Sequence, residues 1–135
     1  MKKVFYLFVM LLALSCSNGR PSQEEINKAK EALKFDAELT NKQLSGKWID
    51  SMTLLNSCEF DGQNYVFNEE IDEGYITIDA MREQKETITS NVKLALENNP
   101  QFAGAKENLK TIGGKVIYNY VGSESKKVLT ITIEF

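Results

Sequence analysis

The chain has 135 residues and no histidine, and this absence limits its chemistry more than any feature it contains. Histidine is the commonest general base, the commonest zinc ligand and the base of Ser-His and Cys-His nucleophile pairs. Cys58 could act as a nucleophile, but it lies among apolar neighbours at an inward strand position, where burial raises a thiol's pKa. We therefore expect Cys58 to be buried and inert, and we predict no catalytic residue, metal site or cofactor.

Carboxylates could supply acid–base chemistry or bind Ca²⁺, and four acids lie together at Glu69, Glu70, Asp72 and Glu73. They lack the alternating ligands and central glycine of a calcium loop, and they alternate sides of a strand before entering a loop. We expect them to be a solvated strand end. Glu59 could pair with Glu70 across strands, as glycosidase acids do, but nothing marks either residue as buried.

Two other motifs favour structural roles. Gly113-Gly114 precedes a strand, whereas phosphate-binding glycine loops open a helix, so we interpret it as a helix stop. Trp48 is a candidate contact surface, because tryptophan is enriched at binding hot spots. The sequence favours the alternative that Trp48 seals the junction between a helix and the sheet.

The N-terminus is typical of an export signal. Lys2 and Lys3 precede the eleven apolar residues Val4 to Leu14, which cover only about half of a ~30 Å hydrocarbon core. The ending Ala13-Leu14-Ser15-Cys16 resembles the lipobox of bacterial lipoproteins, although leucine is usual where Ala13 stands. Ala13 and Ser15 also fit ordinary signal-peptidase cleavage, which is the competing interpretation.

We predict a signal peptide over residues 1–15, a lipid such as palmitate on Cys16, a tether over 16–21 and one domain over 22–135. Cleavage would leave 14 basic and 19 acidic side chains, a net charge of −5, which disfavours nucleic acid as a partner. With Cys16 acylated, Cys58 has no disulfide partner, so packing must supply the stability.

Periodicity predicts the elements that position these residues. A helix from about Ser22 to Leu44 begins with a capping box of Ser22 and Glu25. Two strands then flank the turn Asp61-Gly62-Gln63-Asn64. In that hairpin we expect Phe60 opposite Tyr65, Cys58 opposite Phe67 and Leu54 opposite Ile71, with Ser57, Glu59, Asn68 and Glu70 on the other face.

A second helix is predicted from Asp79, as N-cap, to about Glu97, and a third from Asn99, as N-cap, to Gly113. A second hairpin follows, in which Tyr120 faces Leu129, Tyr118 faces Ile131 and Val116 faces Ile133. We therefore predict an α+β fold: an N-terminal helix, then ββ-α-α-ββ, with an antiparallel sheet covered by helices on one face.

Three stretches resemble a loose group of small exported bacterial proteins: Asn41-Lys42-Gln43-Leu44-Ser45-Gly46-Lys47-Trp48-Ile49-Asp50-Ser51-Met52-Thr53-Leu54-Leu55-Asn56-Ser57, Gly62-Gln63-Asn64-Tyr65-Val66-Phe67 and Gly114-Lys115-Val116-Ile117-Tyr118-Asn119-Tyr120. The group shares an Asn near a helix end, an Asp-x-x-Thr-x-Leu step into a hairpin and a late Tyr-x-Tyr strand. Ser45 stands where many members have Pro, and their helix Cys is missing. The resemblance implies fold and compartment, and no activity.

Together these features predict a lipid-anchored envelope protein of a Gram-negative bacterium, on the outer membrane rather than the inner. We expect a non-enzymatic binding or structural module that contacts an envelope protein or polymer. One alternative is a carboxylate-based enzyme or inhibitor acting on envelope polymers, which would need two buried acids in one cleft. Another is a small-ligand carrier, which would need a cavity of ~300 Å³ or more between sheet and helices.

Overall fold

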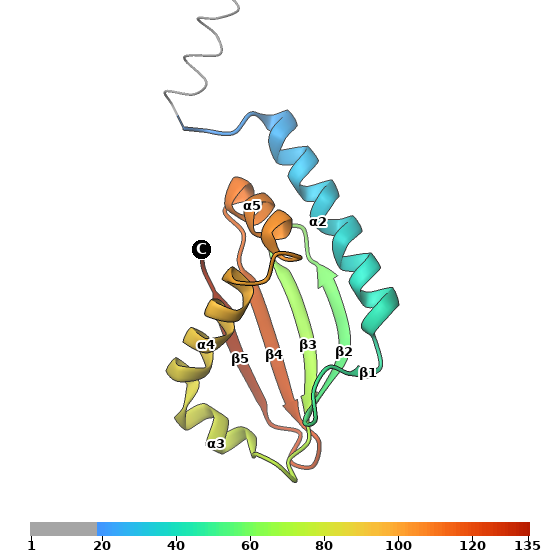
Figure 1. Ribbon diagram of the computed structural model, residues 1–135, viewed down its shortest axis with the longest axis vertical. Helices are drawn as coiled ribbons and strands as arrows, with labels where there is room; N and C mark the ends of the chain where they lie inside the picture. Colours follow the sequence, from blue (N-terminus) through green and yellow to red (C-terminus); the bar gives the residue numbers. More distant parts are fainter. Residues whose placement is uncertain (1–18) are drawn as a thin grey trace, which may run out of the picture.

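A computed structural model describes residues 19–135, so the predicted signal peptide and Cys16 lie outside the described residues. The elements are α2 (Gln23–Leu44), β1 (Lys47–Trp48), β2 (Thr53–Phe60), β3 (Tyr65–Ile71), α3 (Ile78–Glu83), α4 (Lys85–Glu97), α5 (Ala103–Ile112), β4 (Val116–Gly122) and β5 (Val128–Ile133). In Figure 1, α2 flanks the sheet on the β2 side, whereas α3 and α4 lie on the β5 side. The predicted α+β fold is confirmed.

The strands form one sheet in the order β1-β2-β3-β4-β5. Adjacent strands are antiparallel except β3 and β4, which are parallel, so the prediction of an antiparallel sheet is wrong at this pair. The reason is the connection, because α3, α4 and α5 return the chain to the end of the sheet where β3 began. The two hairpins therefore lie side by side in the same sheet.

The first hairpin has the predicted turn between Phe60 and Tyr65, and the registers of both hairpins agree with the prediction except at one end. Phe60 pairs with Tyr65 and Cys58 with Phe67, but Leu54 faces Glu70 rather than Ile71, because the register shifts between Leu55 and Ser57. The second hairpin pairs Tyr120 with Leu129, Tyr118 with Ile131 and Val116 with Ile133, as predicted.

The register shift is held by a side chain of α2 and by that of Ser45, the residue that caps the C-terminal end of α2. Ser45 Oγ donates to the carbonyl oxygen of Asn56 at 2.8 Å, and Asn41 Oδ1 accepts from the Cys58 N–H at 2.9 Å. Two backbone groups of β2 beside the shift thus find side-chain partners on α2 and at its C-cap.

The helices begin near the predicted positions, with two differences. α2 has the predicted capping box of Ser22 and Glu25. The next helix is capped by Thr77, whose Oγ1 accepts from the Ala80 N–H at 3.1 Å, and not by Asp79, and it is interrupted at Gln84 between α3 and α4.

The third helix also starts later than predicted. Asn99 Oδ1 accepts from the Gln101 N–H at 3.0 Å, which makes a turn before α5 rather than its cap. At the other end, Gly113 adopts the left-handed conformation (φ 68°), which confirms the helix stop.

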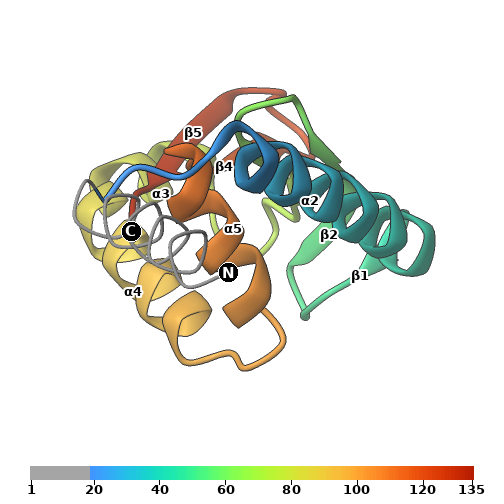
Figure 2. The same ribbon diagram turned by 90° about the horizontal axis from the view of Figure 1, so that it is seen from above.

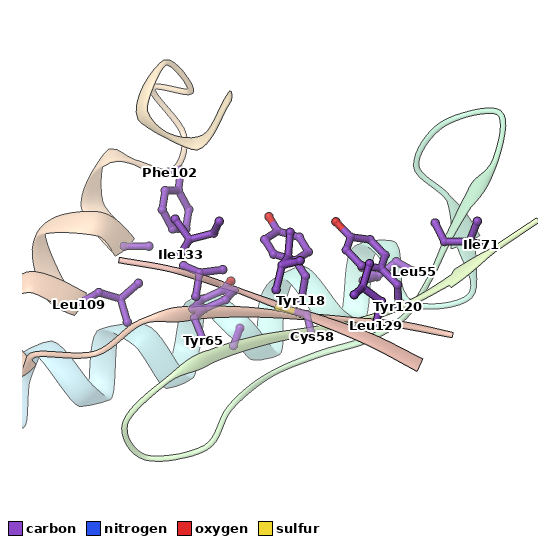
Figure 3. Packing of buried hydrophobic residues seen from close by; sticks show 14 of the residues in the cluster. Leu55, Cys58, Tyr65, Ile71, Phe102, Leu109, Tyr118, Tyr120, Leu129 and Ile133 are labelled. Atoms are coloured by element: carbon purple, nitrogen blue, oxygen red, sulfur yellow. The ribbon is translucent and has the colours of Figure 1, made fainter. Parts of the chain in front are cut away.

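The core lies between the inner face of the sheet and the helices. Figure 3 shows Tyr65, Tyr118 and Ile133 of this face, with Phe102 and Leu109 from the α5 region beside them. The outer face carries the predicted Ser57 and Asn68, and a row of successive hydrogen bonds joins their side chains to those of Asn119 on β4 and Thr130 on β5. Within residues 19–135, no helix is long and apolar enough to cross a membrane.

Candidate functional site

A groove runs over the inner face of the sheet between α2 and the segment formed by α3 and α4. It has two neighbouring chambers, one of about 380 Å³ beside α2 and one of about 580 Å³ beside α4. Both chambers are lined by Ile49, Glu69, Leu96, Asn99 and Tyr118, so they adjoin at these residues. Figure 2 shows α2 and α4 on opposite sides of the molecule, with α5 between them.

Glu69 lies in the middle of the groove floor. It follows Tyr65 and Phe67 at every second position of β3, so its side chain points to the inner face of the sheet. Its neighbours across the sheet are Leu55 on β2 and Tyr120 on β4. A carboxyl group thus occupies an inner-face position that an apolar side chain would ordinarily fill.

The Glu69 carboxyl is buried without a protein partner. The residue is 4% exposed, and among residues 19–135 no side chain or backbone N–H donates a hydrogen bond to it. Burial, and to a lesser extent the negative charge of Asp50, raises the pKa of Glu69 to about 7. Since the described part of the chain holds no fully enclosed polar side-chain atom that lacks a partner, this carboxyl must open onto the groove.

Two tyrosine hydroxyls share the floor with Glu69. Tyr118 and Tyr120 are buried, and in Figure 3 their hydroxyls lie on the same side, away from the strand. The Phe67 and Tyr118 rings stack with centroids 4.8 Å apart, and the Tyr118 and Tyr120 rings stack at 5.9 Å. Desolvation by burial, and next the negative charge of Glu69, raise the pKa of both tyrosines, so both hydroxyls stay neutral.

At the α2 end, a third tyrosine closes the floor. The Tyr65 hydroxyl donates to Asp36 Oδ2 at 2.8 Å and lies 3.3 Å from Thr40 Oγ1. This hydroxyl is therefore satisfied by α2, in contrast to those of Tyr118 and Tyr120.

The walls of the groove are apolar and incompletely packed. α4 has no fully buried residue, and Ile88, Val92 and Leu96 on its inward side are half-buried and line the larger chamber. Exposed apolar side chains lie at the opposite rim, on α2 and in the link between β1 and β2: Leu39, Leu44, Ile49 and Met52. A helix with a half-covered apolar side leaves space that a ligand can fill.

Apart from Glu69, the residues singled out in the sequence do not line the groove. Cys58 is 3% exposed and desolvation raises the pKa of its thiol to about 11, which agrees with an inert cysteine. Trp48 is 56% exposed on the edge strand β1, so the interpretation that it seals the helix–sheet junction is wrong. Glu59 pairs with Val66 and Glu70 with Leu54, so these two acids are not cross-strand neighbours.

The expectation that the acidic cluster is a solvated strand end is wrong for Glu69, because this residue is buried and faces the groove. Glu73 makes a structural contact that the sequence did not indicate. The Glu73 carboxylate accepts from the N–H groups of Glu124 and Ser125, at 3.0 and 2.6 Å, and from Ser125 Oγ at 3.0 Å. These bonds, chiefly those from Ser125, lower the pKa of Glu73. The inward spacing of Tyr65, Phe67 and Glu69 was the available signal for the groove acid.

Metal binding finds no support in the described residues. Between residues 19 and 135 there is no group of three Cys, Asp or Glu side chains that could hold an ion, although Asp36, Asp50 and Glu69 all line the groove. The arrangement instead offers neutral hydroxyls, one buried titratable carboxyl and apolar walls.

Comparison with known proteins identifies a solved structure of similar fold. No protein-family model matches the sequence, and no curated protein matches it. Among solved structures, the chain is similar to a crystal structure of a candidate secreted protein from Pseudomonas aeruginosa, with a TM-score of 0.66 and 10% sequence identity. The similarity covers 84% of this chain and 96% of the other, so the two share one architecture over most of their lengths.

Proposed function

We propose that the protein is an exported, lipid-anchored and non-enzymatic protein of the cell envelope that binds a small ligand in its groove. Support for export comes from the signal-like N-terminus and from the structural neighbour described as a candidate secreted protein. Support for anchoring comes from Cys16 at the end of the apolar segment. In this proposal the lipid holds the groove next to a membrane, the outer membrane of a Gram-negative cell.

One observation carries the ligand-binding proposal: a buried carboxyl and two buried hydroxyls, without protein partners among residues 19–135, open onto a groove with apolar walls. Buried polar groups ordinarily have hydrogen-bond partners. Ligand sites combine apolar walls with a few converging polar groups, in volumes of about 300–1,000 Å³. Both chambers, of about 380 and 580 Å³, have this size.

The test is native mass spectrometry of the protein purified from its host. Val92 on α4 faces the larger chamber, so Val92→Trp should fill the groove, whereas Leu94→Trp alters an exposed position on the same helix. We expect an additional bound mass on the wild type and on Leu94→Trp that Val92→Trp lacks. An equal mass on all three proteins, or no bound mass on the wild type, would refute groove binding.

The anchor has a separate test, fractionation of cells producing wild type or Cys16→Ala. We expect the wild type in the membrane fraction with a diacyl-modified Cys16, and the variant released from it. An unmodified product cleaved at another bond would refute anchoring, and a free exported binding protein would replace it. Trp48, exposed on the edge strand β1, stays a candidate contact with an envelope protein or polymer.

The second candidate is a carboxylate-based enzyme, because a carboxyl with a pKa of about 7 suits a general acid. Glycoside hydrolysis needs a second positioned carboxylate. The other acids of the groove are less suitable, since Asp50 is exposed and Asp36 accepts the hydrogen bond of Tyr65. Release of products from host peptidoglycan or polysaccharide, abolished by Glu69→Gln, would favour the enzyme.

A further inference from the structure

We infer that the groove selects an organic cation, a primary ammonium group on an apolar body, with its nitrogen seated at Glu69. This inference rests on the proposed function and names the ligand class. It follows from three properties of the groove: the sign of its charge, the hydrogen-bonding capacity of its floor and the character of its walls.

The charge of the lining has one sign. Asp36, Asp50 and Glu69 line the two chambers, and no lysine or arginine of residues 19–135 does. Asp50 is exposed at the rim, Asp36 is half-buried on α2, and Glu69 lies at the centre of the floor. An anionic ligand would therefore meet repulsion with no basic partner, whereas a cation would be attracted.

The floor offers acceptors that match an ammonium group. The polar atoms there without partners among the described residues are the carboxylate of Glu69 and the hydroxyls of Tyr118 and Tyr120. An ammonium group has three donors and no acceptor, and a charge-assisted bond to a carboxylate is stronger than a neutral one. A buried ion pair would also give the isolated carboxylate its missing partner.

The walls require an apolar body. Apolar side chains line the larger chamber. Ile88, Val92 and Leu96 come from α4, and Ile71, Ile76 and Met81 come from β3, the segment after it and α3. A small hydrated cation would leave these side chains uncovered, whereas an aromatic or alkyl body would bury them. The groove thus fits an amine with its polar end at the floor and its apolar end toward α4.

Binding should depend on the protonation of Glu69. The charged or titratable groups lining the groove around it are Asp50 from the β1–β2 link, Asp36 from α2, Tyr65 from β3, and Tyr118 and Tyr120 from β4. α3 and α4 contribute only apolar residues, and Gln84 between them is neutral. All of these groups are acidic or neutral. Affinity for an amine should therefore rise between about pH 5.5 and about pH 8, as Glu69 loses its proton.

The experiment compares three ligands of nearly equal size: phenethylamine, phenethyl alcohol and hydrocinnamate, which are cationic, neutral and anionic. The full chain is held in lipid nanodiscs, and binding is measured by calorimetry against empty nanodiscs. The variants are Glu69→Gln, Asp50→Asn and the control Glu70→Gln, whose side chain lies on the opposite face of the same strand.

We expect the amine to bind at least about tenfold more tightly than the alcohol or the carboxylate at pH 8. Glu69→Gln should weaken amine binding about tenfold or more, flatten its pH dependence and leave alcohol binding within about twofold. Asp50→Asn should weaken amine binding by about two- to threefold, and Glu70→Gln should have no effect. Alcohol binding also reports that the Glu69→Gln groove is folded.

Equal or tighter binding of the alcohol or the carboxylate would overturn the cation inference, and so would unchanged amine binding by Glu69→Gln. These failures are distinct from failure of the proposed function. If no probe binds but the host protein carries a bound mass that Val92→Trp loses, the ligand class is wrong and groove binding stands. If that mass is also absent, both proposals fail.

Discussion

At the scale of single residues, the buried position of Glu69 makes its ionised carboxylate destabilising to the fold. Its pKa of about 7 in the folded chain exceeds the value of about 4.3 expected in the unfolded chain. The folded state therefore binds this proton more tightly, and the free energy of unfolding falls as pH rises between these two values. A group retained at such a cost is better explained by ligand binding than by stability.

Glu69→Gln should remove this cost. At pH 8 without ligand, we expect the variant to be more stable than the wild type by up to about 3 kcal/mol, and the difference should vanish near about pH 4. Urea unfolding at the two pH values measures the effect. Glu70→Gln is the matched control and should leave the pH dependence unchanged; a Glu69→Gln variant less stable than the wild type at pH 8 would contradict the account.

Gly114 is a second position where a single substitution should change stability, because the backbone there leaves no space for a Cβ atom. A Cβ there would collide with the carbonyl oxygen of Gln63 and lie 2.9 Å from Leu109 Cδ2. We expect Gly114→Ala to lower the free energy of unfolding by more than about 2 kcal/mol. Gly104 in α5 has open space around it, so Gly104→Ala should be neutral or stabilising by up to about 1 kcal/mol, as thermal unfolding can show.

At the scale of elements, α2 supports the irregular part of β2. Asn41 Oδ1 accepts from the Cys58 N–H, so Asn41→Ala should leave that half-buried donor without a partner. We expect a loss of about 1–2 kcal/mol in urea unfolding. Among residues 19–135, the Asn27 side chain bonds only to exposed Gln23 on the same helix, so Asn27→Ala should change stability by less than about 0.5 kcal/mol. Equal losses in the two variants would argue against this role of Asn41.

Glu73 joins the segment after β3 to the turn between β4 and β5. Its pKa is lowered in the folded state, so its stabilising effect is present above the unfolded pKa and is lost as pH falls through the folded value. Glu73→Gln should speed hydrogen exchange at the Glu124 and Ser125 amides at neutral pH, with little added effect in acid. Unchanged exchange at these amides would show that the contact does not hold the turn.

Element types and most registers were predictable because they depend on neighbours in the chain. The Ser22 capping box, the Gly113 stop and the pairing of Tyr118 with Ile131 all follow from local patterns. The shift opposite Leu54 was not predictable, because side chains from α2 and its C-cap, more than ten residues away in the chain, stabilise it. The parallel pairing of β3 with β4 likewise depends on how three helices cross the sheet.

The groove itself could not be predicted, although its central residue could. Strand alternation placed Glu69 beside Phe67 on the inward face, but the adjacent acids suggested a solvated strand end. Whether an inward carboxyl is covered or opens onto space depends on where α2 and α4 lie over the sheet. That arrangement comes from tertiary packing and leaves no local pattern in the chain.

At the scale of the whole molecule, the central claim is that the buried carboxyl of Glu69, which has no partner among residues 19–135, makes this groove a binding site. The most direct measurement is the pKa of the Glu69 carboxyl by NMR titration of the full chain in nanodiscs, with and without phenethylamine. We predict a value of about 7 that falls when the amine is added. An ordinary value of about 4.3 without ligand, or a value that the amine leaves unchanged, would contradict the account.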